Sequence, residues 1–318
     1  MPREMLIAMA GGAISGFASM AFLWGIPGAI LAVYLAPLPL LLVGLDHGIR
    51  AVSIAALGGI VFAGVFGGPM AGVLYAAVHA LPMWIIVWLA LIKQTVITPS
   101  GGTAEKWYPA GYILCILSVL AAGMMVVAFV SAMPEQGGLI GMVKAYLEQV
   151  FSFMMPTLED AARAELVDGI APLFPGYLAI SWVVMAAINA SIAMAVLTRV
   201  GRTMRPKTKL ADLALQDWMS WALIGAAAMA LLGQGELEYI GRNLALILAV
   251  PFFFLGLAVV HTVVRRVSFP GTLITAFYVM LILSGWIAMI VIGTGLIEQW
   301  AGIRRHLKGP GPVRNGND

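Results

Sequence analysis

Long apolar runs, each bounded by charged residues, glycine or proline, are the feature that most constrains how this chain can fold. A helix needs about 20 apolar residues to cross the hydrocarbon core of a bilayer. Of all residues, 61% are hydrophobic and only 10% are charged, whereas soluble domains carry about 25% charged residues. Because backbone amides in hydrocarbon must be hydrogen-bonded within the protein, the runs are predicted to be helices. They lie at 5–24, 26–45, 49–66, 70–92, 110–132, 176–198, 216–233, 243–264 and 270–297.

These runs predict an all-α fold, a polytopic membrane helical bundle with eight or nine transmembrane helices. Residues 1–298 are expected to form a single membrane domain. Residues 299–318 are expected to form a short polar tail, and the Gly-, Pro- and Asn-rich composition of its end predicts disorder. Most basic residues lie between the apolar runs, where they indicate orientation in a lipid bilayer and not a nucleic-acid partner.

Loop charge predicts which side of the membrane each connection occupies. The segment 199–209 carries five basic residues and no acidic residue, which predicts a cytoplasmic location. Counting spans back from it places the N-terminus on the same side, together with a polar cluster in which Asp46 can cap a helix and pair with Arg50 beside His47. Nine spans would place Arg304 outside, against the same rule, so the side of the tail stays open.

The segment 133–175 is predicted to be an extracytoplasmic insertion, because its acidic residues outnumber its basic ones. Apolar residues recur at helical spacing from Leu139 to Met154, which predicts an amphipathic helix in the outer membrane interface. A polar helix is expected near 157–170. Two interpretations remain open: a helix packed over the bundle, or a lid over a central cavity.

Polar side chains in the middle of predicted spans are the best candidates for ligand contact, because they are costly at that depth. Tyr75 and His79 share a face by their spacing of four residues, and Pro82 has no amide hydrogen to offer the Val78 carbonyl beside His79. On a later span, Trp182 and Asn189 are seven residues apart and also share a face. We predict a ligand-binding patch from Tyr75, His79, Trp182 and Asn189; the alternative is hydrogen bonding between helices.

Small residues mark a second feature. Ala8, Gly12 and Gly16 form a stripe along one face of the first helix, and such a stripe allows another helix to approach closely. It is therefore a predicted helix-docking face. The docked helix could belong to this chain or to another.

The sequence contains none of the motifs G-x-x-x-x-G-K-[ST], H-E-x-x-H or G-x-S-x-G. The predicted spans also carry no carboxylate at mid-membrane. We therefore expect no enzyme activity, no catalytic residue, no metal and no cofactor. The single cysteine, Cys115, excludes an intramolecular disulfide.

Two stretches carry a resemblance to a known family. Gly67-Gly68-Pro69-Met70-Ala71-Gly72, and the ending Gly295-Leu296-Ile297-Glu298-Gln299-Trp300 followed by Ile303-Arg304-Arg305, resemble the YybS-like family of bacterial polytopic membrane proteins. That family is in turn distantly similar to the S components of energy-coupling-factor vitamin importers.

The resemblance implies a multi-pass protein of the bacterial inner (plasma) membrane with an S-component-like bundle. It also implies a transmembrane coupling subunit and ATPases as partners, with Ala8, Gly12 and Gly16 matching the docking positions of an S component. The chain departs from that pattern by about three additional spans, and it shows no vitamin-specific signature.

Two hypotheses of function follow. The first is the substrate-binding or transport membrane component for a small or amphipathic molecule. The second is a non-transporting membrane scaffold that assists cell-envelope or division machinery. Substrate identity, direction of transport and oligomeric state stay open.

Overall fold

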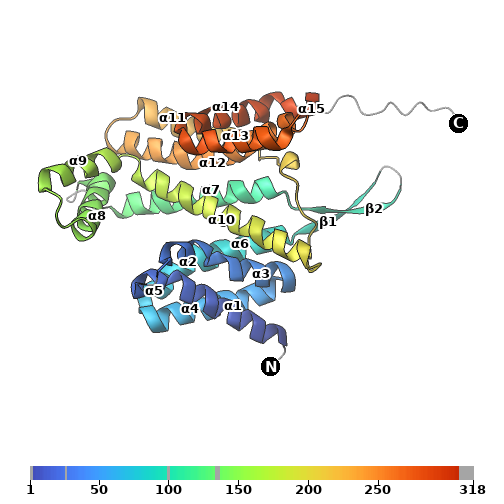
Figure 1. Ribbon diagram of the computed structural model, residues 1–318, viewed down its shortest axis with the longest axis horizontal. Helices are drawn as coiled ribbons and strands as arrows, with labels where there is room; N and C mark the ends of the chain where they lie inside the picture. Colours follow the sequence, from blue (N-terminus) through green and yellow to red (C-terminus); the bar gives the residue numbers. More distant parts are fainter. Residues whose placement is uncertain (1–2, 26, 99–100, 133–136, 308–318) are drawn as a thin grey trace. The chain divides into compact units, whose positions relative to one another are not determined.

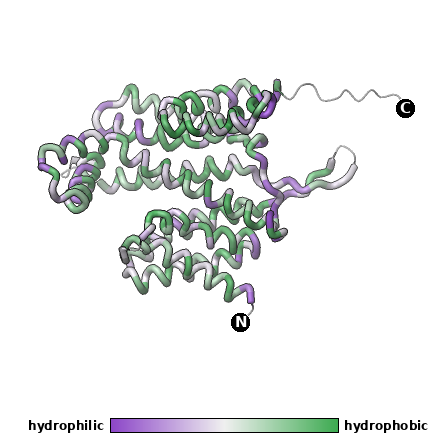
Figure 2. The backbone as a smooth tube through the Cα atoms, viewed as in Figure 1, coloured by the Kyte–Doolittle hydropathy of each residue, from purple (hydrophilic) through white to green (hydrophobic). Residues whose placement is uncertain are grey.

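The computed structural model describes residues 3–25, 27–98, 101–132 and 137–307, and most of these residues are helical (Figure 1). The hydrophobic residues run along the helices, and the hydrophilic ones gather near helix ends and in connections (Figure 2). The predicted all-α, polytopic membrane fold is confirmed.

The described chain forms two compact units. Unit 1 contains residues 1–117 and 182–208, and unit 2 contains residues 118–181 and 209–318. Two of the three boundaries fall inside long helices, α7 (Ala110–Ser131) and α10 (Phe174–Arg199), and the third lies between residues 208 and 209 in the connection that follows α10. The single membrane domain expected over 1–298 therefore stays a prediction.

Fewer helices are long enough to cross a bilayer than the eight or nine that the sequence predicts. Helix α1 (Arg3–Ser19) has 17 residues and α11 (Trp218–Leu232) has 15. At 1.5 Å per residue they extend about 25 Å and 22 Å, less than the ~30 Å hydrocarbon core. Within the described residues, six long apolar helices remain, at Ala29–His47, Ile49–Gly67, Pro69–Ala90, Ala110–Ser131, Phe174–Arg199 and Glu236–Val264.

The last apolar run is not a simple span either. It is divided into α13 (Pro270–Leu283) and α14 (Gly285–Ala301), which meet at an angle of 116°. Ser284, in an extended conformation between them, breaks the helix. If the bent pair counts as one span, the described chain has seven candidate spans.

In unit 1, α1 packs closely on α4 (Ile49–Gly67). The span Ala29–His47 consists of α2 (Ala29–Leu35) and α3 (Pro37–His47). The span Pro69–Ala90 contains α5 (Pro69–Tyr75), a π-helical turn (Ala76–Ala80) and α6 (Leu81–Ala90). A short 3-10 helix (Ala21–Trp24) lies between α1 and α2.

Unit 1 also contains an antiparallel hairpin, which the sequence analysis does not predict. Strands β1 (Lys93–Ile97) and β2 (Thr103–Trp107) pair with Lys93 opposite Trp107. The Lys93 ammonium lies 2.5 Å from Glu105 Oε1 and 5.4 Å from the centre of the Trp107 ring. The β-branched residues before Pro99 and the glycines after it are a usable strand–turn signal.

In unit 2, α12 (Glu236–Val264) is the central helix, and α11 and α14 pack against it. Glycines permit this approach: a Cβ added at Gly256 would lie 2.0 Å from the Val291 carbonyl oxygen, and one added at Gly295 would lie 1.9 Å from that of Phe252. A hydrogen bond also joins α12 to the residues just before α10: Asn243 Nδ2 donates to the Pro172 carbonyl at 2.9 Å.

Two helices lie within residues 137–173 of the expected insertion. Helix α8 (Gly138–Met154) and helix α9 (Asp160–Ile170) pack together through Leu147, Val167 and Ala171. Residues 133–136 lie outside the described chain. The location of α8 in the membrane interface, and the lid hypothesis, stay predictions.

The beginning of the expected polar tail is mostly helical. Residues 299–301 continue α14, and α15 (Ile303–Leu307) follows. The Arg304 guanidinium donates to buried Glu298 at 2.8 Å and to the carbonyls of Ala211 and Leu213 at 2.8 and 2.7 Å. These charge-assisted bonds order the segment. Residues 308–318, where a disordered end was predicted, lie outside the described chain.

Candidate ligand-binding pocket

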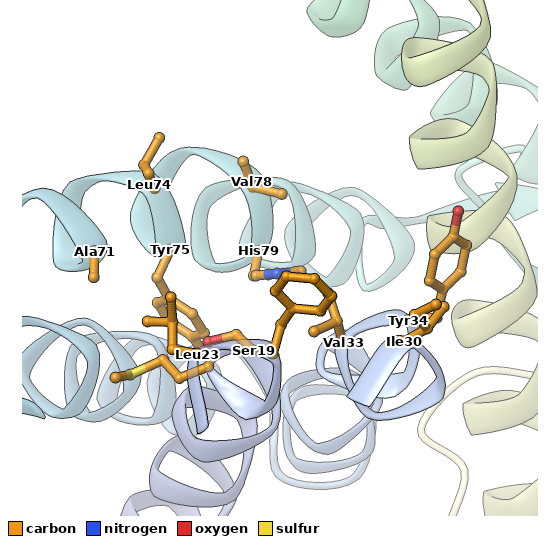
Figure 3. Close-up of a pocket in the computed structure, with 12 residues that line it drawn as sticks. Ser19, Leu23, Ile30, Val33, Tyr34, Ala71, Leu74, Tyr75, Val78 and His79 are labelled. Atoms are coloured by element: carbon orange, nitrogen blue, oxygen red, sulfur yellow. The ribbon is translucent and has the colours of Figure 1, made fainter. Parts of the chain in front are cut away.

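A pocket of about 400 Å³ lies in unit 1. Its walls come from the end of α1, the 3-10 helix, α2 and the span that contains α5 and the π-helical turn (Figure 3). A volume of ~300–1,000 Å³ is typical of small-molecule sites. Tyr75 and His79, two of the four predicted ligand-binding residues, lie in this lining.

Tyr75 is held in place by a chain of hydrogen bonds. Its hydroxyl donates to Ser15 Oγ at 2.7 Å, and Ser15 Oγ donates to the Ala36 carbonyl at 2.5 Å. Gly59 on α4 makes room for the ring, since a Cβ there would lie 2.3 Å from the Tyr75 oxygen. The sequence analysis misses Ser15, although it adjoins Gly16 of the small-residue stripe.

His79 lies in the π-helical turn, one helical turn after Tyr75. The two ring centres are 5.6 Å apart, and both side chains point toward α1 and α2 in Figure 3. Only 6% of His79 is exposed, and its Nδ1 has no hydrogen-bond partner within the described residues of the chain. Single π-helical turns inside α-helices frequently occur at functional sites.

Trp182 supplies the hydrogen bond that Pro82, which has no amide hydrogen, cannot give to the Val78 carbonyl. The Trp182 indole Nε1 donates to the Val78 carbonyl at 2.8 Å. The sequence argument for an available Val78 carbonyl is therefore confirmed, and its partner is the indole of α10. Trp182 is not among the residues that line the pocket.

Asn189 has a similar role about two helical turns later on α10. Its Nδ2 donates to the Tyr34 carbonyl at 2.8 Å and to the Met185 carbonyl at 2.9 Å. Tyr34 lines the pocket, whereas Asn189 does not. The four predicted residues are thus divided: Tyr75 and His79 line the cavity, and Trp182 and Asn189 attach α10 to its walls.

The small-residue stripe is covered by a helix of this chain. Ala8 is fully buried, a Cβ added at Gly12 would lie 2.1 Å from the Ala55 carbonyl oxygen, and one added at Gly16 would lie 3.1 Å from that of Gly59. Because Ala55 and Gly59 belong to α4, the docked helix is α4. The alternative in which this face receives a helix of a separate coupling subunit is not supported.

The polar cluster at the start of α4 has a different partner from the one predicted. Asp46 pairs with Arg202 at 2.8 Å and lies 3.3 Å from His47, whereas Arg50 has no recorded bond to it among the described residues. Arg205 is buried and donates to the Ala90 carbonyl at 3.4 Å; this burial lowers the pKa of its guanidinium. The basic segment 199–209 therefore lies at the same end of unit 1 as Asp46, as the orientation argument requires.

Among the described residues, no group of three or more His, Cys, Asp or Glu side chains is placed to hold a metal ion. The pocket instead combines apolar walls with a few hydroxyl and imidazole groups.

Comparison with known proteins identifies a family for this chain but does not indicate an activity. No curated protein and no solved structure matches the chain. A family model described as "Predicted membrane protein (DUF2232)" matches residues 13–298, which include both Tyr75 and His79. The description extends neither to the YybS-like family nor to S components. The chain therefore belongs to the DUF2232 family of predicted membrane proteins.

Proposed function

We propose that this protein is the substrate-binding membrane component of a transport system for a small amphipathic molecule in the bacterial inner membrane, and that the pocket of unit 1 is its binding site. The observation that carries the proposal is the buried, unpartnered Nδ1 of His79 in the pocket wall, among the residues that the structure describes. A buried polar atom without a partner costs about 1–3 kcal/mol. A bound molecule that supplies the missing hydrogen bond would recover that cost.

The side chains around His79 are suited to binding a molecule and not to converting it chemically. Tyr75, whose ring centre lies 5.6 Å from that of His79, donates its hydroxyl proton to Ser15 and so forms a fixed part of the wall. The proposal assigns no catalytic step to the chain and no resident cofactor. Because the sequence contains no phosphate-binding loop, a transport step driven by ATP would require separate coupling and ATPase subunits. Such subunits would dock on a surface other than the α1 stripe.

Native mass spectrometry of the gently solubilised protein tests this proposal. The wild type is expected to retain a small-molecule adduct, and His79→Ala is expected to lose most of it. His261→Ala is the matched control, because His261 also lies in a long apolar helix but contacts Tyr278 in unit 2 and does not line the pocket. Thermal unfolding of all three proteins separates loss of ligand from loss of fold.

The outcomes discriminate between the two hypotheses of function. A retained adduct together with a co-purifying ATPase supports the transport component. Equal adduct occupancy in the wild type and His79→Ala would overturn the assignment of the site. An empty pocket in a protein that co-purifies with cell-envelope assembly proteins would favour the scaffold.

A further inference from the structure

The charge of the pocket lining restricts the class of ligand, provided that the proposed binding function holds. Within the described residues, the lining contains Ser, Tyr and His side chains among apolar ones, and no Lys, Arg, Asp or Glu. A phosphate or carboxylate group would need a cationic partner at a desolvated site, and an ammonium group would need a carboxylate. The lining supplies neither, so the polar group of the ligand is expected to be uncharged.

The mouth of the pocket indicates where the ligand comes from. Phe22, Leu23 and Ile30 line the pocket and are 69%, 65% and 69% exposed. Ile30 belongs to the candidate span Ala29–His47, and Phe22 and Leu23 lie in the short helix just before it. At the end of a membrane span, exposed apolar side chains are stabilised by contact with lipid. Leu23 and Ile30 stand at the α1–α2 side of the cavity in Figure 3. A molecule that passes these residues must itself be soluble in the bilayer.

The polar contacts of the pocket match a hydroxyl group. A neutral imidazole has one donor and one acceptor nitrogen, and Nδ1 of His79 is unpaired among the described residues. Ser19, which also lines the pocket, donates its own proton to the Gly16 carbonyl at 2.7 Å and keeps acceptor capacity on its oxygen. A hydroxyl can both donate and accept, so it can satisfy His79 in either tautomer.

We propose that the pocket binds an uncharged lipid alcohol, a molecule with an apolar chain and a hydroxyl group, which enters from the bilayer and hydrogen-bonds to Nδ1 of His79. The apolar chain lies along Phe22, Leu23 and Ile30. The volume of about 400 Å³ accommodates the hydroxyl end and the adjoining stretch of the chain, and the rest of the molecule stays in lipid.

Photo-crosslinking of the full-length protein in lipid nanodiscs tests the proposal. The probe is a long-chain alcohol that carries a diazirine, and crosslinked peptides are identified by mass spectrometry. Unlabelled competitors of the same chain length are the alcohol, its phosphate monoester and the alkane. We expect labelling of the peptide that contains Phe22, Leu23 and Ile30, and at least tenfold stronger competition by the alcohol than by either analogue.

Two substitutions at one position isolate the hydrogen bond. His79→Phe keeps a ring and removes the nitrogen, so it should weaken competition by the alcohol about five- to tenfold, the effect of one hydrogen bond of about 1 kcal/mol or slightly more. His79→Asn restores an amide near the position of Nδ1 and should recover most of this loss. His261→Phe, outside the pocket, should leave competition unchanged.

Failure of this inference differs from failure of the proposed function. If the pocket is labelled but the phosphate monoester or the alkane competes as well as the alcohol, the pocket binds a ligand of another class and the alcohol is wrong. If the pocket peptide is not labelled and native mass spectrometry also finds no adduct, the binding function itself is wrong.

Discussion

At the scale of single residues, the sequence predicts which backbone groups lack a local hydrogen-bond partner better than it predicts which distant side chain bonds to them. The absent amide hydrogen of Pro82 identifies the Val78 carbonyl from local geometry alone. Its donor, Trp182, is 104 residues away along the chain. No local sequence pattern indicates that Trp182 pairs with Val78. The sequence analysis therefore predicts that Trp182 contacts a ligand, whereas in the structure it bonds to the pocket wall.

Trp182→Phe measures the contribution of this bond. The substitution keeps most of the aromatic surface and leaves the Val78 carbonyl without its indole donor. We expect the free energy of unfolding to fall by about 1 kcal/mol, the size of a hydrogen bond between membrane helices. Denaturant titration in mixed micelles gives the measurement.

Trp218→Phe is the control for that experiment. The Trp218 indole is exposed and donates to the neighbouring Gln216 at 2.6 Å, so its loss should change stability little. An equal effect of both substitutions would show that the Val78 bond contributes nothing specific.

At the scale of elements, the type of element is predictable and its ends are not. Hydropathy correctly indicates helices along the spans, amphipathicity indicates α8, and the polar helix expected near 157–170 corresponds to α9. The break at Ser284 is invisible to hydropathy, because α13 and α14 are apolar on both sides of it. Glu298 shows the same limit: the predicted run ends at 297, yet α14 continues and buries this carboxylate against Arg304.

Gly12→Leu tests the contact between α1 and α4. A Cβ alone would lie 2.1 Å from the Ala55 carbonyl oxygen, so the larger side chain must separate the two helices. Overpacking of this kind costs roughly 1–3 kcal/mol or more. We expect a lower unfolding temperature and less monodisperse protein in size-exclusion chromatography.

Gly123→Leu is the matched substitution on α7, where an added Cβ meets nothing within 4 Å. It should behave like the wild type. If Gly12→Leu unfolds at the same temperature as Gly123→Leu, the close packing of α1 on α4 is wrong.

At the scale of the whole molecule, the bent pair α13–α14 suggests an explanation for the conflict between span counting and tail charge. Arg304 reaches the carbonyls of Ala211 and Leu213, which follow the basic segment 199–209. Groups in hydrogen-bond contact lie on the same side of the membrane. Arg266, before α13, also donates to the Leu307 carbonyl after α14, so the two ends of the bent pair lie together. We therefore predict that α13 and α14 form a re-entrant pair, which would place the C-terminal basic residues on the side that the positive-inside rule favours.

Labelling of introduced cysteines with a membrane-impermeant maleimide checks this topology in a Cys115→Ala background. Lys209→Cys and Arg305→Cys are both at exposed positions of unit 2 and should react from the same face of oriented vesicles. Glu159→Cys, in the predicted extracytoplasmic segment, should react from the other face. Reaction of positions 209 and 305 from opposite faces would contradict the re-entrant arrangement.

The Trp182–Val78 bond also bears on how the protein is made. At a translation rate of about 5–20 residues per second, the 104 residues that separate Val78 from Trp182 take roughly 5–20 s to synthesise. During that interval the span Pro69–Ala90 has been synthesised, but the Val78 carbonyl still lacks its indole donor. The wall that contains His79 is completed only when α10 is in place, so the order of synthesis, and not the local sequence, sets the moment at which this wall forms.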